Sequence, residues 1–255
     1  MFKKTPLLAG LTIACVLSAP EAFAQEYTGF YFGVWGGGGS VDSASKSEFD
    51  EVVLDSLPLE LAMAAAQISD EDQQVTFALG STDDSTLDDS VSTWGVQVGY
   101  RWGKYFASEV GYANLGQASY RLPATVNFTV SDADGFGFGS FDVERESKFS
   151  SSGPTLSAIG ILPLGERFNL QARGGIYLAD TRLTNRIRDI QFAENVGHRR
   201  VDASETELLG GVAANWNVTE RLSLRLEYQR FFDVGDDSKT GESDVDVFNL
   251  GVLFR

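Results

Sequence analysis

Strict alternation of large apolar residues with small or polar residues is the feature that most constrains how this chain folds. In residues 94–102, WGVQVGYRW, every even position is large and apolar, while the odd positions hold Gly, Gln, Gly and Arg. Residues 222–229, LSLRLEYQ, follow the same rule, as do shorter stretches at 30–35 and 248–254. A period of two residues sends alternate side chains to opposite faces of a β-strand. The pattern therefore predicts an all-β fold whose strands have two chemically different faces.

Eight segments of this kind can be placed along the chain. They cover approximately residues 28–38, 93–102, 106–115, 155–163, 168–179, 207–216, 222–232 and 245–254. Short connections at 103–105, 164–167 and 217–221 alternate with long polar connections at 39–92, 116–154, 180–206 and 233–244. This alternation places all the tight turns at one end of an antiparallel sheet and all the long loops at the other.

Two kinds of closed barrel use eight antiparallel strands, and they differ in which face points inward. A lipocalin has an apolar interior, whereas a membrane barrel has a polar interior and an apolar face toward lipid. The interior of an eight-stranded barrel is just wide enough for side chains, and buried charges there must pair with one another. Here the face that alternates with the large apolar residues is small or charged, which favours the membrane barrel. Its expected polar network in the lumen comprises Gln97, Arg101, Glu109, Arg225 and Glu227.

The fold predicted is thus an eight-stranded antiparallel transmembrane β-barrel with long extracellular loops and tight periplasmic turns. Aromatic residues flank the short turns, as is typical of a membrane–water interface. The 116–154 connection also alternates, which indicates that its two flanking strands continue above the membrane as a hairpin. The alternative is a ten-stranded barrel, with the additional pair drawn from residues 119–148.

The N-terminal residues have the pattern of a secretory signal peptide. Lys3 and Lys4 precede an apolar run from residue 7 to 19, and Ala22-Phe23-Ala24 provides the small-x-small cleavage pattern. The apolar run of about 13 residues is too short for a membrane-spanning helix, which needs about 20. We therefore expect a signal peptide over residues 1–24 and a barrel domain over residues 25–255, exported to the outer membrane of a Gram-negative cell.

Composition excludes several classes of function. The chain has 36 Asp and Glu against 20 Lys and Arg, and this net charge of −16 argues against nucleic acid as a partner. The single Cys lies in the predicted signal peptide, and the single His, His198, is followed by Arg199 and Arg200 rather than by a nucleophile. We expect no catalytic residues, no cofactor and no metal site, and therefore no enzyme.

Two of the long connections carry unbalanced charge. Residues 42–91 hold most of the excess of carboxylates, which either recruits divalent cations or simply keeps a surface loop solvated. Within this loop, Ser56 is suited to cap a short helix over residues 57–67 that lies across the barrel mouth or contacts another molecule. The 180–206 connection is locally basic where its five arginines lie, and we expect it to contact lipopolysaccharide phosphates. Its arginines are Arg182, Arg186, Arg188, Arg199 and Arg200.

The strands resemble the membrane domain of outer-membrane protein A and the related eight-stranded opacity-type surface proteins. The resemblance lies in residues 94–116, 174–181, 224–236 and 249–255, and it covers the strands rather than the loops. It implies a charged network in the barrel core that has been proposed to open and close a narrow pore. Glu109 and Arg225 match two members of that network, but Ile159 and Asn215 stand where the family has a lysine and a glutamate. Half of the switch is therefore missing, which favours a static buried pair.

The sequence predicts a barrel that anchors extended surface loops, in a structural, envelope-integrity or adhesion-type role. Its expected partners are outer-membrane lipid and lipopolysaccharide, with divalent cations and a host or cell-surface ligand as further candidates. The alternative function is a narrow channel for ions or small solutes, lined by the polar network of the lumen.

Overall fold

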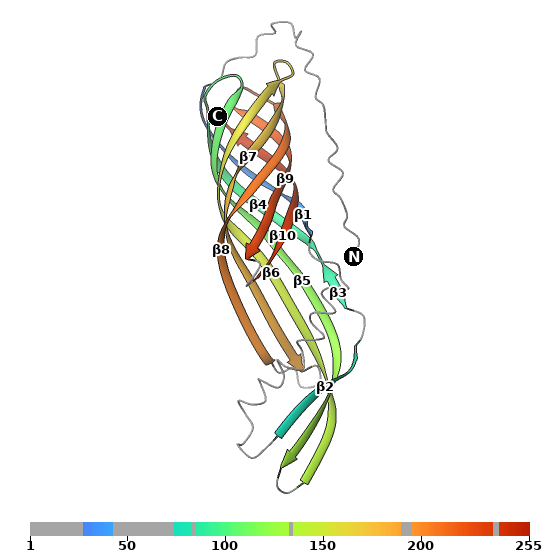
Figure 1. The fold of residues 1–255 in the computed structure, drawn as a ribbon. Helices are drawn as coiled ribbons and strands as arrows, with labels where there is room; N and C mark the ends of the chain where they lie inside the picture. Colours follow the sequence, from blue (N-terminus) through green and yellow to red (C-terminus); the bar gives the residue numbers. More distant parts are fainter. Residues whose placement is uncertain (1–27, 43–73, 83–84, 133–134, 190–194, 237–239) are drawn as a thin grey trace, which may run out of the picture.

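The computed structural model describes the chain in six segments, which cover residues 28–42, 74–82, 85–132, 135–189, 195–236 and 240–255. Eight of the ten strands in these segments pair side by side into a closed antiparallel barrel (Figure 1). In order around the ring they are β1 (Gly29–Asp42), β4 (Ser90–Arg101), β5 (Phe106–Asp132), β6 (Gly135–Pro163), β7 (Phe168–Asp189), β8 (Asn195–Asn217), β9 (Leu222–Asp236) and β10 (Gly241–Phe254). Pairing of β1 with β10 closes the ring. The predicted eight-stranded antiparallel β-barrel is confirmed.

The two remaining strands lie outside the ring. Strands β2 (Gln74–Thr82) and β3 (Thr86–Asp88) both pair with the outer part of β5. The ten-strand alternative is wrong, because residues 119–148 lengthen β5 and β6 instead of forming a further pair in the barrel. The expected hairpin above the membrane is present as this extension. The helix predicted over residues 57–67 lies outside the described residues.

The strands are longer at one end of the barrel than a membrane requires. β5 and β6 contain 27 and 29 residues, whereas a tilted strand crosses a bilayer with about 10. Figure 1 shows β5, β6, β7 and β8 running well past the closed part of the barrel, with β2 beside the far end of the β5–β6 hairpin. At the opposite end, tight turns connect β4 to β5, β6 to β7 and β8 to β9. Among the described residues, no helix is long and apolar enough to cross a membrane.

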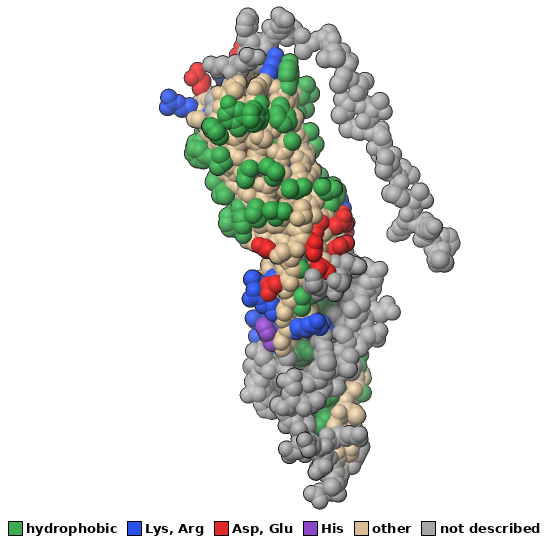
Figure 2. Space-filling model, turned by 60° about the vertical axis from the view of Figure 1, so that its left-hand side comes forward, with side chains coloured by type: hydrophobic (Ala, Val, Ile, Leu, Met, Phe, Trp, Pro, Cys, Tyr) green, Lys and Arg blue, Asp and Glu red, His purple; other side chains and the backbone are tan. Residues whose placement is uncertain are grey.

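The outer face of the closed part is apolar, as the alternation predicts. Large side chains such as Phe32, Val98, Leu170 and Leu226 are between 45% and 61% exposed there. Figure 2 shows hydrophobic side chains forming a belt across the face in view, with charged side chains mainly below it and a few at its upper edge. At the periplasmic rim, the rings of Phe168 and Trp216 stack with their centroids 6.0 Å apart. This belt of apolar residues edged by aromatic rings is typical of a lipid-facing surface.

Glycines on the inner face make room for large rings in the lumen. A Cβ atom at Gly95 would collide with the ring of Trp35, and one at Gly99 would collide with the ring of Tyr31. Both glycines stand on β4, next to β1, which carries the two rings. The small residues at odd positions of this strand are thus a packing requirement of the narrow barrel.

A β-bulge on β5 changes which residues of that strand face inward. Gly116 has a φ of +81°, and the pairing of β5 with β6 shifts register between Asn114 and Gln117. Before the bulge the buried residues are odd-numbered, whereas beyond it they are even-numbered, such as Tyr120 and Leu122. An extra residue in one strand reverses the alternation downstream of it. The inner face of the barrel is therefore continuous with the buried face of the outer hairpin.

Candidate functional site

Four charged side chains from three different strands meet in the middle of the lumen. Glu109 on β5 accepts hydrogen bonds from Arg225 Nη1 on β9 at 2.8 Å and from Arg173 Nη2 on β7 at 2.5 Å. Arg173 Nε also donates to Glu227 Oε1 at 2.6 Å. All four side chains are at least nine-tenths buried. Two carboxylates and two guanidiniums therefore form a neutral cluster, which we call the lumen cluster.

Tyr31 completes the lumen cluster from β1. Its hydroxyl donates to Glu109 Oε1 at 2.6 Å, so that each oxygen of this carboxylate is engaged. Ser157 on β6 accepts a longer hydrogen bond of 3.4 Å from Arg173 Nη1. Buried charges of opposite sign with satisfied hydrogen bonds hold their neighbours in one arrangement. The cluster ties β1, β5, β7 and β9 together across the barrel.

The five residues expected in the lumen differ in what they contact. Glu109, Arg225 and Glu227 belong to the lumen cluster. Gln97 is buried on β4 between Gly33 and Gly111 of the adjacent strands, and takes no part in the hydrogen bonds of the cluster. Arg101 lies at the periplasmic end of β4, where its Nε and Nη2 donate to the carbonyls of Gly103 and Lys104 at 2.8 and 3.0 Å.

Arg173 is the charged member of the cluster that sequence reasoning missed, and Tyr31 was likewise not predicted. Its signal is present in the alternation, because Asn169, Gln171, Arg173 and Gly175 occupy the odd positions of β7 and are polar or small. Ile159 and Asn215, which stand at the family's lysine and glutamate positions, are both fully buried. Arg173 and Glu227 thus supply a second ion pair from positions that the resemblance does not indicate.

Apolar side chains fill the lumen on both sides of the lumen cluster. On the outer side, Trp35, Tyr177, Leu209 and Phe231 belong to one buried group, and the rings of Tyr177 and Phe231 meet edge to face at 5.0 Å. On the periplasmic side, a smaller buried group contains Ile159, Ile161 and Leu253 together with Tyr31 and Ala107. In the described residues, the charged layer therefore lies between an outer apolar layer and a periplasmic layer in which buried polar side chains such as Gln171 and Asn215 accompany the apolar group.

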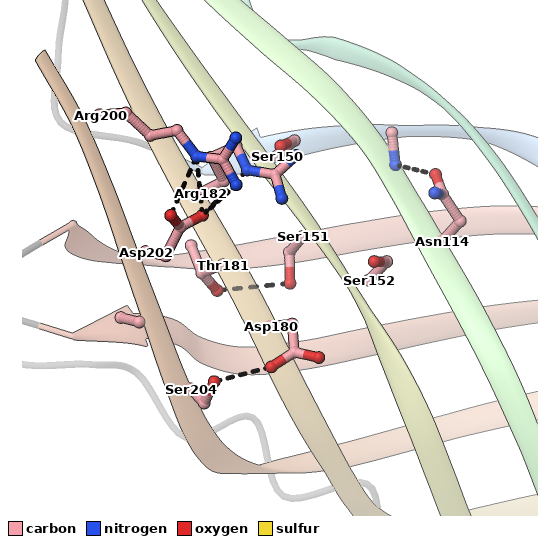
Figure 3. Close-up of a pocket in the computed structure, with 12 residues that line it drawn as sticks. Asn114, Ser150, Ser151, Ser152, Asp180, Thr181, Arg182, Arg200, Asp202 and Ser204 are labelled. Atoms are coloured by element: carbon pink, nitrogen blue, oxygen red, sulfur yellow. Dashed lines mark hydrogen bonds and ion pairs between the residues drawn. The ribbon is translucent and has the colours of Figure 1, made fainter.

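A second polar site lies on the outside of the barrel, beyond the apolar belt. It is a cavity of about 480 Å³ between the outer parts of β5, β6, β7 and β8 (Figure 3). Asp202 accepts hydrogen bonds from Arg182 and from Arg200, each at 2.9 Å, and Asp180 accepts one from Ser204 at 2.7 Å. The hydrogen bonds from Arg200 and Arg182 lower the pKa of the Asp202 carboxyl. We call this site the outer ledge.

The height of the outer ledge relative to lipid follows from the strand spacing. Leu178 on β7 is 45% exposed and belongs to the apolar belt, whereas Asp180 and Arg182 follow it on the same outward face. Two and four residues along a strand correspond to about 7 and 13 Å. The ledge therefore stands at the level of the outer lipid headgroups.

Other groups that could support chemistry are sparse in the described part of the chain. His198 is exposed on β8, opposite Arg186 on β7. Within the described residues, no three His, Cys, Asp or Glu side chains are grouped as a metal site would require. Most of the acidic connection 42–91 lies outside the described residues, so its expected cation binding stays a prediction.

The closed barrel, its lipid-facing belt and its polar lumen define the class of protein: this is a Gram-negative outer-membrane β-barrel. A family model of the OmpA-like transmembrane domain matches residues 27–255, and the chain belongs to that family. The resemblance expected from the strands is thereby confirmed. The signal peptide over residues 1–24 stays a prediction, since those residues lie outside the described part.

Solved outer-membrane barrels resemble this chain at low sequence identity. Ail, the attachment invasion locus protein of Yersinia pestis, in complex with the heparin analogue sucrose octasulfate, is 12% identical, with a TM-score of 0.40, covering 89% of this chain and 99% of that one. Neisserial surface protein A is 12% identical with a TM-score of 0.41, covering 90% and 97%. OprG from Pseudomonas aeruginosa is 13% identical with a TM-score of 0.37, covering 90% and 98%. No curated protein sequence matches the chain significantly.

Proposed function

We propose that this protein is a non-enzymatic anchor whose filled barrel holds an extended β-structure at the cell surface. In this role the barrel contributes to the envelope and presents the outer strands to lipopolysaccharide and to ligands on other cells. The observation that carries the proposal is the contrast between a packed lumen and greatly lengthened outer strands. A pore would need an open lumen, whereas an anchor needs only the lengthened outer strands.

The lumen layers support an anchor over a narrow channel. Phe231 and Tyr177 are fully buried in the outer apolar layer, and Glu109 in the charged layer is 2% exposed. Ion flux through such a lumen would require the outer apolar layer and the charged cluster to part. The packing of the described residues therefore supports the anchor over the channel.

The length of the outer strands gives the anchor its reach. If about 10 of the 27 residues of β5 cross the bilayer, about 17 extend beyond it, which corresponds to roughly 55 Å along the strand. β2 widens this extension by pairing with β5 from Gln74 to Thr82. Strands joined in this way present a firm surface, unlike a single flexible loop.

The outer ledge supports lipopolysaccharide as one partner. Arg182 and Arg200 share the single carboxylate of Asp202, and guanidinium groups bind phosphate oxygens in a bidentate geometry. The ledge stands at headgroup level, where the phosphates of lipopolysaccharide would meet it. Arg186 and Arg199 extend the same basic hairpin outward.

Single-channel recording of the refolded protein tests the anchor against the channel. A planar bilayer that holds the folded barrel should show no reproducible current steps, with folding confirmed by the heat-dependent shift in gel mobility. Steady current steps that Glu109→Gln alters would instead establish a conducting path past the lumen cluster.

Shortening the β5–β6 hairpin tests the surface role. Leu122 pairs with Arg145, so replacing residues 122–145 by Asn-Gly leaves the pair Arg121 and Glu146 next to a two-residue turn. The shortened barrel should fold, and cells that display it should lose attachment to surfaces or other cells. A matched control replaces Thr129 and Phe138, which pair near the tip, by Ala. Attachment that survives the shortening would contradict the proposed role of the hairpin.

A further inference from the structure

The periplasmic mouth of the barrel contains a polar cavity that the anchor role does not use. It measures about 670 Å³, and its lining includes Arg101, Asn169, Asn217 and Arg255. A second, smaller cavity of about 20 Å³ is lined by Asn215 and Arg225 and shares Arg101 and Arg255 with the first. We call the two together the periplasmic vestibule. It leads from the mouth to the edge of the lumen cluster.

Positive charge dominates the vestibule of a chain that is strongly acidic overall. The net charge of the chain is −16, yet the charged side chains at the ends of β4 and β10 are Arg101 and Arg255. Arg101 forms hydrogen bonds with two turn carbonyls, and no carboxylate of the described residues forms an ion pair with it. The two glutamates that line the cavity, Glu166 and Glu220, lie in the turns rather than on the strands.

Amide side chains add further donors around these arginines. Asn217 Oδ1 accepts from Arg255 Nη2 at 2.6 Å, from Ser223 Oγ at 2.9 Å and from Asn215 Nδ2 at 3.1 Å. Asn169 Oδ1 accepts from Gln171 Nε2 at 2.8 Å. The carbonyl oxygens of these two asparagines thus accept hydrogen bonds within the protein, and their amide nitrogens are donors by chemistry.

The deep end of the vestibule holds two buried polar atoms without a hydrogen-bond partner among the described residues. They are Arg225 Nε, a donor, and Asn215 Oδ1, an acceptor, on side chains that are 2% and 1% exposed. Both residues line the small cavity. A volume of about 20 Å³ accommodates one water molecule, which can accept from the first atom and donate to the second. A water at this position would leave its second proton free to reach an anion at the mouth.

We propose that the periplasmic vestibule binds a phosphate group. Arg101 and Arg255 supply guanidinium donors for its oxygens, and a water in the small cavity connects the phosphate to Arg225. Guanidinium and phosphate match in geometry and charge, and the partly enclosed mouth strengthens their attraction relative to open water. The phosphate comes either from the headgroup of a phospholipid in the periplasmic leaflet or from free phosphate in the periplasm.

Titration with inorganic phosphate tests the site itself. The full barrel, refolded in an uncharged detergent at constant ionic strength, is titrated with phosphate while heat of binding is measured. Arg101→Gln and Arg255→Gln should each weaken binding about tenfold, which corresponds to about 1.4 kcal/mol, since each removes a hydrogen bond to a charged group. Arg101→Lys keeps the charge but loses the planar guanidinium group. Its affinity for phosphate should lie between those of wild type and Arg101→Gln.

Lys104→Gln is the matched control, because it removes the same charge from the turn next to Arg101. Lys104 lies over the ring of Tyr105, with its Nζ 5.5 Å from the ring centroid, and does not line the vestibule. Its affinity for phosphate should stay within twofold of wild type. If Lys104→Gln and Arg101→Gln lost phosphate affinity equally, in variants that retain the heat-dependent gel shift, the proposed site would be wrong. The absence of phosphate binding by wild type would contradict it equally.

A second experiment, on retained lipid, then distinguishes the two sources of phosphate. The barrel is purified from bilayers that contain phosphatidylglycerol, and retained lipid is counted by native mass spectrometry. One phospholipid retained by wild type and Lys104→Gln, but lost from Arg101→Gln, assigns the vestibule to a lipid headgroup. Phosphate binding without retained lipid assigns it to free phosphate. Lipid retained equally by all variants, without phosphate binding by wild type, contradicts the proposal.

Discussion

Replacing Glu109 by Gln should destabilise the barrel by about 3–5 kcal/mol, although the side chain keeps nearly the same shape. In the wild-type protein its carboxylate accepts from Arg173 at 2.5 Å, from Arg225 at 2.8 Å and from Tyr31 at 2.6 Å. The substitution leaves two buried guanidiniums to share Glu227 as their only carboxylate in the cluster. Removing one partner of a buried ion pair typically costs 3–5 kcal/mol, because the remaining charge is uncompensated. The three contacts share one carboxylate, so their energies are not additive.

Urea unfolding in lipid vesicles, followed by tryptophan fluorescence until the unfolding and refolding curves agree, measures this loss. The double variant Glu109→Gln and Arg225→Gln restores a neutral cluster, and it should recover a large part of the stability. Asp202→Asn on the exposed outer ledge is the surface control and should change stability far less than Glu109→Gln, because exposed ion pairs contribute little. A loss below about 1 kcal/mol for Glu109→Gln would refute the argument that the lumen cluster is a tightly coupled buried network. A double variant as unstable as the sum of the two single variants would refute it equally.

Three further predictions test packing and charge elsewhere. Gly153→Ala should cost about 1–3 kcal/mol in unfolding free energy, since its Cβ would collide with a backbone carbonyl of β7. Ile159→Lys should lower the urea midpoint well below that of Ile159→Met, because Ile159 is 1% exposed and the introduced amine would be buried beside an already neutral cluster. The carboxyl of Asp202 should titrate below the ordinary value of about 3.9, and Arg200→Gln should raise its pKa, as followed by carboxyl carbon NMR. The ion pairs of Asp202 thus stabilise the folded state above pH 4 and lose that effect as pH falls through the lowered pKa.

The barrel itself follows from the sequence because lipid and lumen impose opposite chemistry on successive residues. In β9, Leu224 and Leu226 face outward while Arg225 and Glu227 are buried, as the alternation predicts. The contact of Glu109 with Arg225, 116 positions apart, is also accessible to reasoning, since two opposite charges in a narrow lumen must find each other. The short turns and the order of the strands then fix which segments are neighbours.

Features that depend on exact register or on local backbone geometry were not accessible in the same way. The bulge at Gly116 reverses the inward parity of β5, so simple alternation fails beyond it. Strands β2 and β3 add to the outside of β5 through backbone pairing, which leaves little trace in side-chain pattern. Arg173 was missed because a polar residue at an inward position has many possible partners. The carboxylates it contacts depend on the stagger between strands.

The geometry of Glu109 argues for a static lumen cluster rather than a gate. A charged gate in a narrow lumen can open only if its ion pairs part. In this protein each oxygen of Glu109 is held by a different arginine at the same time, Oε1 by Arg225 and Oε2 by Arg173. The lysine and glutamate positions of the family are occupied by Ile159 and Asn215, so no alternative charged partner exists at those two positions. Because the charges balance with both arginines in place, parting any pair would leave a buried charge uncompensated, and the closed state is the one that the cluster stabilises.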